Sequence, residues 1–352
     1  MKESARPTLS TNTKEERHTF VPGPPRLMRC EAKVVSSIIT TLPSATEIVC
    51  LLGLEDKLVG VTHECDYPPS VRKEKVVMKS IFDSTRMNSR DIDDQVIKHV
   101  RNGRSIYEID EGSLQELKPD LVITQELCEA CATPLQVIAK SIAKIRPKPK
   151  VLSLSPHSLE DILYNIIEVG NESGVADRAK KVASSLAARI DGVKSKCFEN
   201  PDLARPSVFC LEWLDPLYCC GHWVPEIVGY AGGREILRRA GEPSFVTEWD
   251  KVVELDPEVI FVTVCGYHVE RTLSEISTLT QKQNWNGLRA VKNGRVYVLD
   301  SPAYFSRSGP RLVDGLEIMA ALLHPTLFPE CLFPERAACS LEEHRYLSTP
   351  ML

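Results

Sequence analysis

An internal duplication limits the fold of this chain more than any other feature of its sequence. The stretch TEIVCLLG at residues 46–53 matches PEIVGYAG at residues 225–232, and ELKPDLVIT at residues 116–124 matches ELDPEVIFV at residues 254–262. In both copies a capped helix comes first, and a polar turn with proline then leads into a buried strand. Because both matches occur in the same order, the sequence favours two similar α/β lobes.

The first copy begins with a strand, a short loop and a helix. Val34, Val35, Ile38 and Ile39 predict a buried strand. Pro43 and the sequence SATE at residues 44–47 follow, and SATE is a capping-box signature. We therefore expect the capping box to mark the start of a helix that ends near residue 53.

Residues 158–200 predict the connection between the lobes. The sequence SLED at residues 158–161 is a helix-capping signature, and apolar residues then recur at helical spacing as far as Ile190. We expect one long helix here, weakened near residues 170–174. A single stiff connector predicts small relative motion of the two lobes.

A length of 352 residues suits two domains with tails better than one average core. We expect the following organisation: a disordered leader over residues 1–30, an N-terminal α/β lobe over 31–157, the connecting helix over 158–200, a C-terminal α/β lobe over 201–325 and a tail over 326–352. The tail is rich in Pro, Cys and charge, which predicts surface loop or disorder.

Composition and charge argue against several classes of protein. Lys and Arg total 43 against 48 Asp and Glu, a net charge of −5, and no basic stripe with interleaved aromatics is present, so we expect no nucleic-acid partner. The longest apolar stretches are too short to cross a bilayer, so we expect no membrane insertion. Residues 1–30 lack a signal-peptide core, which predicts a cytoplasmic location and leaves organellar targeting by these residues open.

The loops that follow the predicted strands carry most of the unusual side chains. Ligands of open α/β sheets bind outside the carboxyl ends of the strands, so loops from two facing lobes would line one cleft. We expect these residues to bind the ligand: Pro43, Ser44, Thr46, His63, Tyr67, His157, Trp213, His222, Trp223, Tyr304, Phe305 and Arg307. Taken singly, each of them is as compatible with a turn or a core position.

Four of the twelve cysteines fall in the same loops. We hypothesise that Cys65, Cys128, Cys131 and Cys265 face a shared cavity and touch its ligand or a metal. A zinc knuckle would need a second cysteine pair close to Cys128 and Cys131, and none is present. A structural disulfide does not fit a reducing cell interior. Core or turn positions are the alternative for these cysteines.

Five motifs carry a family resemblance that runs from about residue 33 to residue 325. They are SIITTLPSATEIVCLLGLEDKLVGVTHECDYPP, PDLVITQELCEAC, VLSLSPHSLEDIL, LEWLDPLYCCGHWVPEIVGYAGG and YFSRSGPRLVDGLEIMAALLHP. They resemble the cobalamin and iron-complex periplasmic-binding family of ABC importers, and more narrowly its intracellular-looking branch of cobalamin-binding proteins. The resemblance implies two Rossmann-like lobes bridged by one long α-helix, with a corrinoid or iron chelate in the cleft between them. The matching ligand positions are Pro43, Ser44, Trp213, Trp223, Tyr304, Phe305 and Arg307.

Three functions remain open at this point. The first is a soluble binding protein without catalysis that holds a small molecule, cobalamin or a related corrinoid or a metal chelate. The second is a redox enzyme that holds a metal ion or an iron–sulfur cluster on the cleft cysteines and histidines. The third is a scaffold that binds a protein partner in its cleft. Because no export signal is found, we do not expect an ABC permease as partner.

Overall fold

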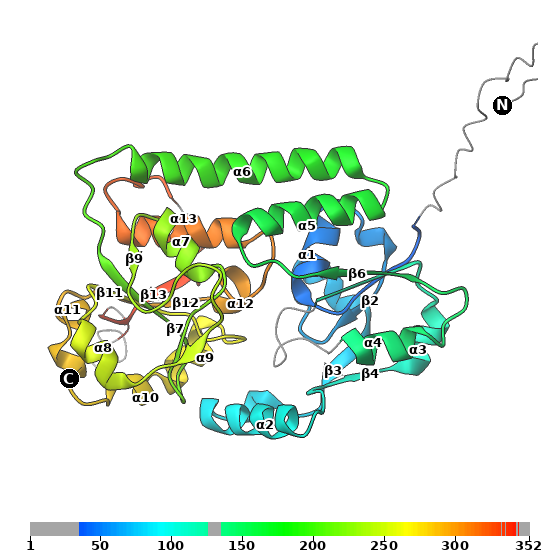
Figure 1. The fold of residues 1–352 in the computed structure, drawn as a ribbon, viewed down its shortest axis with the longest axis horizontal. Helices are drawn as coiled ribbons and strands as arrows, with labels where there is room; N and C mark the ends of the chain where they lie inside the picture. Colours follow the sequence, from blue (N-terminus) through cyan, green and yellow to red (C-terminus); the bar gives the residue numbers. More distant parts are fainter. Residues whose placement is uncertain (1–34, 126–134, 332, 335, 343, 345–352) are drawn as a thin grey trace, which may run out of the picture. The chain divides into compact units, whose positions relative to one another are not determined.

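The structure is a computed structural model that describes residues 35–125, 135–331, 333, 334, 336–342 and 344 (Figure 1). The leader predicted over residues 1–30 lies outside the described residues.

The first lobe is built on a six-stranded sheet with the order β4-β3-β2-β1-β5-β6. All neighbouring strands are parallel except β4, which runs antiparallel to β3 at the edge. The central strands are buried on both faces, as expected for a parallel sheet covered by helices. The strands are β1 (Ile38–Thr40), β2 (Leu58–Thr62), β3 (Lys75–Ser80), β4 (Tyr107–Ile109), β5 (Leu121–Gln125) and β6 (Lys150–Leu154).

The second lobe has a seven-stranded sheet with the order β10-β8-β7-β11-β12-β13, and β9 pairs with β7. Its centre, β7, β11 and β12, is parallel, whereas β8, β10 and β13 join antiparallel. The strands are β7 (Ser207–Trp213), β8 (Tyr218–Cys219), β9 (Arg234–Glu235), β10 (Phe245–Val246), β11 (Val259–Val262), β12 (Val296–Leu299) and β13 (Ala338–Ser340).

Helices flank both sheets (Figure 1). Among the described residues, none of the helices combines the length and the apolar composition needed to cross a bilayer. The α-helices are α1 (Pro43–Leu51), α2 (Ser89–Arg101), α3 (Glu111–Leu117), α4 (Leu135–Ile142), α5 (Leu159–Glu172), α6 (Ala176–Phe198), α7 (Val224–Tyr230), α8 (Trp249–Leu255), α9 (Val269–Glu275), α10 (Ser277–Thr280), α11 (Arg289–Lys292), α12 (Ser301–Tyr304) and α13 (Leu312–Leu323). Short 3-10 turns are η1 (Glu55–Lys57), η2 (Pro69–Lys73), η3 (Ser84–Arg86) and η4 (Trp285–Gly287).

The two lobes repeat one another where the sequence does. Helix α1 follows β1, and β5 pairs with β1 in parallel; helix α7 follows β7 in the chain, and β11 pairs with β7 in parallel. The turns before β5 and β11 also match, because Lys118 and Asp256 both adopt a left-handed conformation, with φ of 43° in each. The prediction of a two-lobe α/β fold is therefore confirmed.

The tail does not follow its prediction. Ala338–Ser340 forms β13, which pairs antiparallel with β12 at the edge of the second sheet. The prediction of loop or disorder is wrong for these residues. Three residues are too few to show the alternation from which a strand is recognised.

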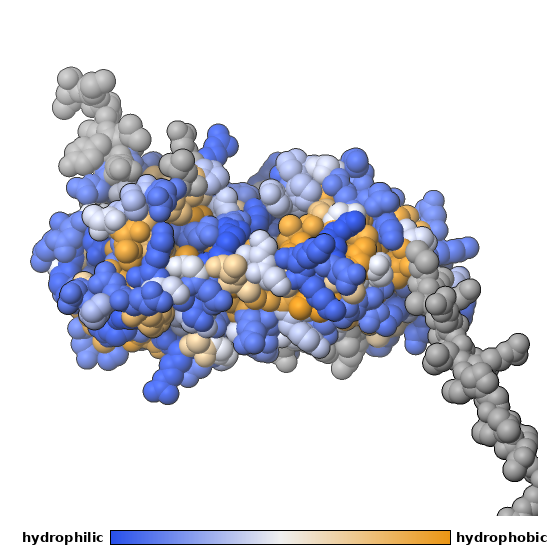
Figure 2. Space-filling model, turned by 90° about the horizontal axis from the view of Figure 1, so that it is seen from above, coloured by the Kyte–Doolittle hydropathy of each residue, from blue (hydrophilic) through white to orange (hydrophobic). Residues whose placement is uncertain are grey.

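The connection between the lobes also differs from its prediction. Residues 158–200 form two helices, α5 and α6, because the chain turns between them through Gly174 at φ +76°. The long helix that reaches both lobes is α6. Its Arg178 donates to the carbonyl of Leu52 at 2.5 Å, and its Arg189 binds the α13 carboxylate Glu317 at 2.6 and 2.9 Å. Figure 2 looks onto the side of the molecule that carries α6, where hydrophilic residues predominate over smaller hydrophobic patches.

Helices α5 and α6 pack closely at Gly170. A Cβ atom at this position would lie 2.2 Å from the Cβ of Ala179, far inside contact distance. The pair therefore depends on glycine at residue 170.

Replacement of Gly170 by Ala should lower the free energy of unfolding by about 1–3 kcal/mol, because the added methyl overpacks the helix pair. Chemical denaturation measures this. Gly192 on α6 is the matched control, since nothing lies within 4 Å of its position. Gly192→Ala should leave stability unchanged or raise it by up to about 1 kcal/mol. Equal stabilities of the two variants would contradict the close packing.

Candidate ligand-binding site

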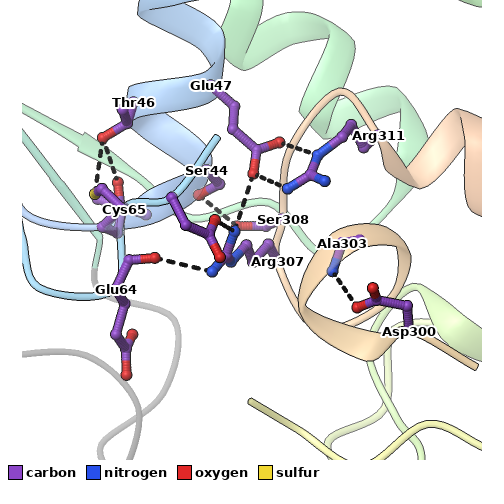
Figure 3. A network of polar contacts seen from close by, with 12 residues as sticks. Ser44, Thr46, Glu47, Glu64, Cys65, Asp300, Ala303, Arg307, Ser308 and Arg311 are labelled. Carbon is purple, nitrogen blue, oxygen red and sulfur yellow. Dashed lines mark hydrogen bonds and ion pairs between the residues drawn. The ribbon is translucent and has the colours of Figure 1, made fainter. Parts of the chain in front are cut away.

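A buried carboxylate joins the two lobes at the carboxyl ends of their strands. Glu47 on α1 has a side chain only 4% exposed and points toward the segment between α12 and α13 (Figure 3). Arg311 binds it with two hydrogen bonds, from Nε at 2.9 Å and from a terminal nitrogen at 2.6 Å. Such paired, charge-assisted hydrogen bonds are among the strongest in proteins. The interlobe contact is therefore centred on Glu47.

Arg307 extends this network into the loop after β2. It lies 3.4 Å from the Glu47 carboxylate, 2.6 Å from the carboxylate of Asp66 and 2.9 Å from the carbonyl of Glu64. Figure 3 shows Arg307 between Glu47 and Glu64. We call Glu47, Asp66, Arg307 and Arg311 the interlobe ion network.

The network also affects the protonation of Asp66 and Arg307. Burial raises the pKa of Asp66, but the hydrogen bond and charge of Arg307 outweigh it and leave that pKa below its usual value. Burial lowers the pKa of Arg307, but Asp66 and Glu47 outweigh it, so the net shift is upward. Both groups therefore stay charged at neutral pH.

Hydroxyl and amide groups continue the contact beside the ions. Ser44 Oγ lies 3.4 Å from Ser308 Oγ. The side-chain amide of Gln125 donates to Ser308 Oγ at 3.2 Å. A Cβ at Gly309 would lie 3.3 Å from Cβ of Ser44, so the second lobe approaches α1 closely here. Backbone and side chains of both lobes thus meet at α1.

Aromatic rings flank the charged groups. The guanidinium of Arg311 lies 4.1 Å from the ring centre of Tyr67 and 5.8 Å from that of Tyr304. Tyr67 is 47% exposed, so it offers aromatic surface next to the network. Arginine on a tyrosine face gains cation–π attraction.

His268 of the second lobe links Asp66 of the network to Asp300. Its Nδ1 lies 2.9 Å from a carboxylate oxygen of Asp300, and its Nε2 lies 3.9 Å from Asp66. The hydrogen bond to Asp300 raises the pKa of His268, and the charges of both carboxylates add to this effect. Asp300 also caps α12 by accepting from the backbone of Ala303.

Several predicted ligand residues lie at this contact. Ser44 and Arg307 are members of it, Tyr67 and Tyr304 flank Arg311, and Pro43 begins α1. Thr46 is buried beneath them, with its hydroxyl 2.6 Å from that of Thr40. Their binding to a ligand stays a prediction.

Two predicted ligand residues belong to the apolar core instead. Trp223 is 5% exposed and Phe305 is 1% exposed, and the indole N–H of Trp223 donates to the carbonyl of Phe305 at 2.7 Å. We expected both residues to bind the ligand and Trp223 to line the cleft; the structure buries both rings in the core, and their binding to a ligand stays a prediction. Their polar neighbours in the sequence suggested exposure, but a backbone carbonyl satisfies the one polar atom of the indole.

The remaining predicted residues are not members of the interlobe ion network. Trp213 is half-buried and donates to the carbonyl of Ser89 from the first lobe at 3.1 Å. His63 and His157 are exposed. His222 has a left-handed backbone, with φ of 56°, and burial lowers its pKa, with a further contribution from the charge of His157.

The four cysteines proposed to share a cavity cannot be compared as a set, because Cys128 and Cys131 lie outside the described residues. Cys65 is 5% exposed, with its sulfur 3.1 Å from the hydroxyl of Thr46, and burial raises the pKa of its thiol. Cys265 is exposed. Within the part of the chain that the structure describes, no group of three or more His, Cys, Asp or Glu side chains is arranged to hold a metal ion.

Sequence reasoning missed Glu47, Asp66, Ser308, Arg311, His268 and Asp300. Glu47 was visible only as a member of the capping box, and that prediction is wrong. Helix α1 begins at Pro43 after Leu42, without a side-chain cap, so Ser44 and Glu47 lie inside the helix. Proline suits the first helical position because it lacks the N–H that a cap would bind.

With the fold and the site described, the class of protein can be stated. The family described as "Periplasmic binding protein" matches residues 38–303, and the chain belongs to this family.

Three relatives illustrate it. An uncharacterized ABC transporter substrate-binding lipoprotein of Bacillus subtilis (strain 168) is 27% identical over 304 residues, which cover 85% of this chain and 83% of the relative. The fold is shared with two solved structures. The periplasmic vitamin B12 binding protein of Vibrio cholerae is 22% identical with a TM-score of 0.61, covering 83% of this chain and 97% of that chain. A periplasmic heme binding protein from Pseudomonas aeruginosa is 21% identical with a TM-score of 0.65, covering 83% and 94%.

These relatives correct the predicted location. They are described as a lipoprotein and as periplasmic proteins, which are extracytoplasmic, so the cytoplasmic prediction is wrong. They do not support the narrower intracellular branch of the family. The expectation against an ABC permease is not supported either, since the Bacillus relative is described as a substrate-binding protein of an ABC transporter.

Replacement of Glu47 by Ala should lower the free energy of unfolding by about 3 kcal/mol, because it leaves Arg311 without its carboxylate in a largely buried position. Chemical denaturation is the measurement. Glu64→Ala is the control, because Glu64 binds Arg307 through its backbone and its side chain is 50% exposed. If Glu47→Ala proves as stable as Glu64→Ala, the network does not hold the lobes together.

Proposed function

We propose that this chain is the substrate-binding protein of an ABC importer and binds a small metal complex between its two lobes, with cobalamin or a related corrinoid as the ligand. Membership of the periplasmic binding protein family supports a ligand at the interlobe contact. Relatives described as binding vitamin B12 or heme support a metal complex of the tetrapyrrole class.

The charge balance of the interlobe ion network is the observation that carries the choice of a corrinoid. Two carboxylates, Glu47 and Asp66, face two guanidinium groups, Arg307 and Arg311, at 2.6–3.4 Å. A ligand with free carboxylates would have to displace one of these partners or lie near them unpaired, and both outcomes cost free energy. A corrinoid instead presents neutral amides around its ring, which can donate to carboxylates and accept from other groups without changing the charge.

The surroundings of the network fit such a ligand. Tyr67 offers exposed ring surface, Tyr304 is half-buried beside it, and Trp213 is half-buried at the interface. Rigid aromatic walls with a few polar groups are typical of sites for large, flat ligands.

Delivery to an ABC permease is part of the proposal. The description of the Bacillus relative as an ABC transporter substrate-binding lipoprotein supports it. The redox-enzyme alternative has no support among the described residues, where metal-ligating side chains do not gather. It is therefore not proposed.

Titration with cyanocobalamin and with hemin, followed by absorbance and by calorimetry, tests the proposed function. We expect saturable binding of one cyanocobalamin per chain, tighter than the binding of hemin, because the network has no spare positive charge for the hemin carboxylates. Tighter binding of hemin would overturn the argument from charge balance, and binding of neither compound would overturn the proposed function.

Replacement of Tyr67 by Ala should weaken cyanocobalamin binding about tenfold, as expected for the loss of one aromatic wall. Tyr164→Ala is the matched control, because Tyr164 is a 60% exposed tyrosine on α5. Equal affinities of the two variants would place the ligand away from the interlobe ion network.

A further inference from the structure

Helix α2 belongs to the first lobe by chain connection and to the second by contact. It lies between β3 and β4, which both pair within the first sheet. Figure 1 shows α2, in cyan, next to α9 of the second lobe and on the opposite side of the molecule from α5 and α6. We call residues 82–101 the interlobe strap.

The second lobe binds the start of α2 through three polar contacts. The indole of Trp213 donates to the carbonyl of Ser89 at 3.1 Å, and the backbone N–H of Ser89 donates to Glu275 at 2.8 Å. Arg90 forms a paired contact with the carboxylate of Asp215, in which Nε lies 3.1 Å from an oxygen. Because Glu275 lies at the N-terminus of α2, its charge also interacts favourably with the helix dipole.

Arg271 on α9 binds the turn that precedes α2. It donates to the carbonyl of Thr85 at 3.1 Å and to that of Met87, and it pairs with Glu275 at 2.9 Å. One arginine thus binds two carbonyl groups of the first lobe and also the carboxylate that accepts from the backbone of α2.

The strap also buries apolar side chains in the second lobe. Ile92 is 8% exposed and belongs to the apolar cluster formed by second-lobe residues such as Leu214 and Val264. Phe82, Met87 and Val96 pack against the same cluster. The contact is therefore a docked interface and more than a set of surface ion pairs.

The strap and the interlobe ion network are the two ends of one row of contacts. Trp213, which binds the strap, lies 5.5 Å from the ring of Tyr267. Tyr267 precedes His268, which faces Asp66 of the network at 3.9 Å. At the other side of the lobes α6 connects them covalently and contacts both. Opening is therefore expected on the side of the strap, away from α6.

We propose that the interlobe strap gates ligand exchange: its release from the second lobe must precede entry of a ligand between the lobes, and its return closes the site. The proposal rests on the proposed function, since it concerns access to the same site. If the strap opens rarely and does not touch the ligand, weakening it speeds entry and exit by the same factor and leaves the equilibrium affinity unchanged.

Arg90→Gln and Ile92→Ala test this, with Lys98→Gln as the matched control. Lys98 is an exposed lysine on α2, so its replacement removes the same charge as Arg90→Gln from the same helix. Stopped-flow mixing with cyanocobalamin should show association and dissociation rates that rise together. The increase should be about threefold for Arg90→Gln, which corresponds to the loss of an exposed ion pair, and at least tenfold for Ile92→Ala. Lys98→Gln should match the unchanged protein.

Hydrogen exchange of the protein alone provides a second measurement. Amides of α2 should exchange faster in Arg90→Gln than in Lys98→Gln, whereas amides of β1 and β7 should exchange equally in both. Rates of Arg90→Gln and Ile92→Ala equal to those of Lys98→Gln, or a change in only one of the two rates and hence in affinity, would overturn the gate. If the unchanged protein binds neither cyanocobalamin nor hemin, the proposed function fails. Hydrogen exchange of the α2 amides then decides by itself whether the strap opens. Equal exchange rates in all variants would overturn opening of the strap.

Discussion

The buried carboxylate of Glu47 is the constraint on which the arrangement of the lobes depends. An ionised carboxylate that is 4% exposed is stable only with partners of opposite charge, because its loss of hydration otherwise costs several kcal/mol. Arg311 and Arg307 supply these partners from a segment more than 250 residues further along the chain. The position of helix α1 therefore depends on the presence of the second lobe beside it.

Local sequence explains how Glu47 reaches this position, and it also explains why the position could not be predicted. Pro43 starts α1, so Ser44 and Glu47 lie three residues apart inside the helix and share one face. That face meets Ser308 and the two arginines. A local pattern identifies the helix, but it assigns Glu47 to a capping box, because the partners that define its role are remote in sequence.

The fold was predictable where the pattern is repeated or local, and the site was predictable only in part. The matched turns at Lys118 and Asp256 have the same left-handed backbone, so the duplication reported true structural equivalence. Ser44 and Arg307 were predicted because they follow strands in the chain. Trp223 was misplaced, since no sequence pattern reveals that the carbonyl of Phe305 satisfies its indole. His268 and Asp300 also depend on a tertiary contact, between loops that follow β11 and β12.

The interlobe ion network and the interlobe strap differ in physical character, and this difference sets the order in which they can separate. Glu47 and its arginines are buried, so salt screens them little and loss of one partner leaves a charge unpaired. Arg90 and Asp215 in the interlobe strap are 50% and 36% exposed, where an ion pair contributes about 1 kcal/mol or less and is screened. Docking of the strap thus depends mainly on Ile92 and its apolar neighbours. The lobes are therefore expected to part first at α2, with the contact at Glu47 and the helix α6 acting as the hinge side.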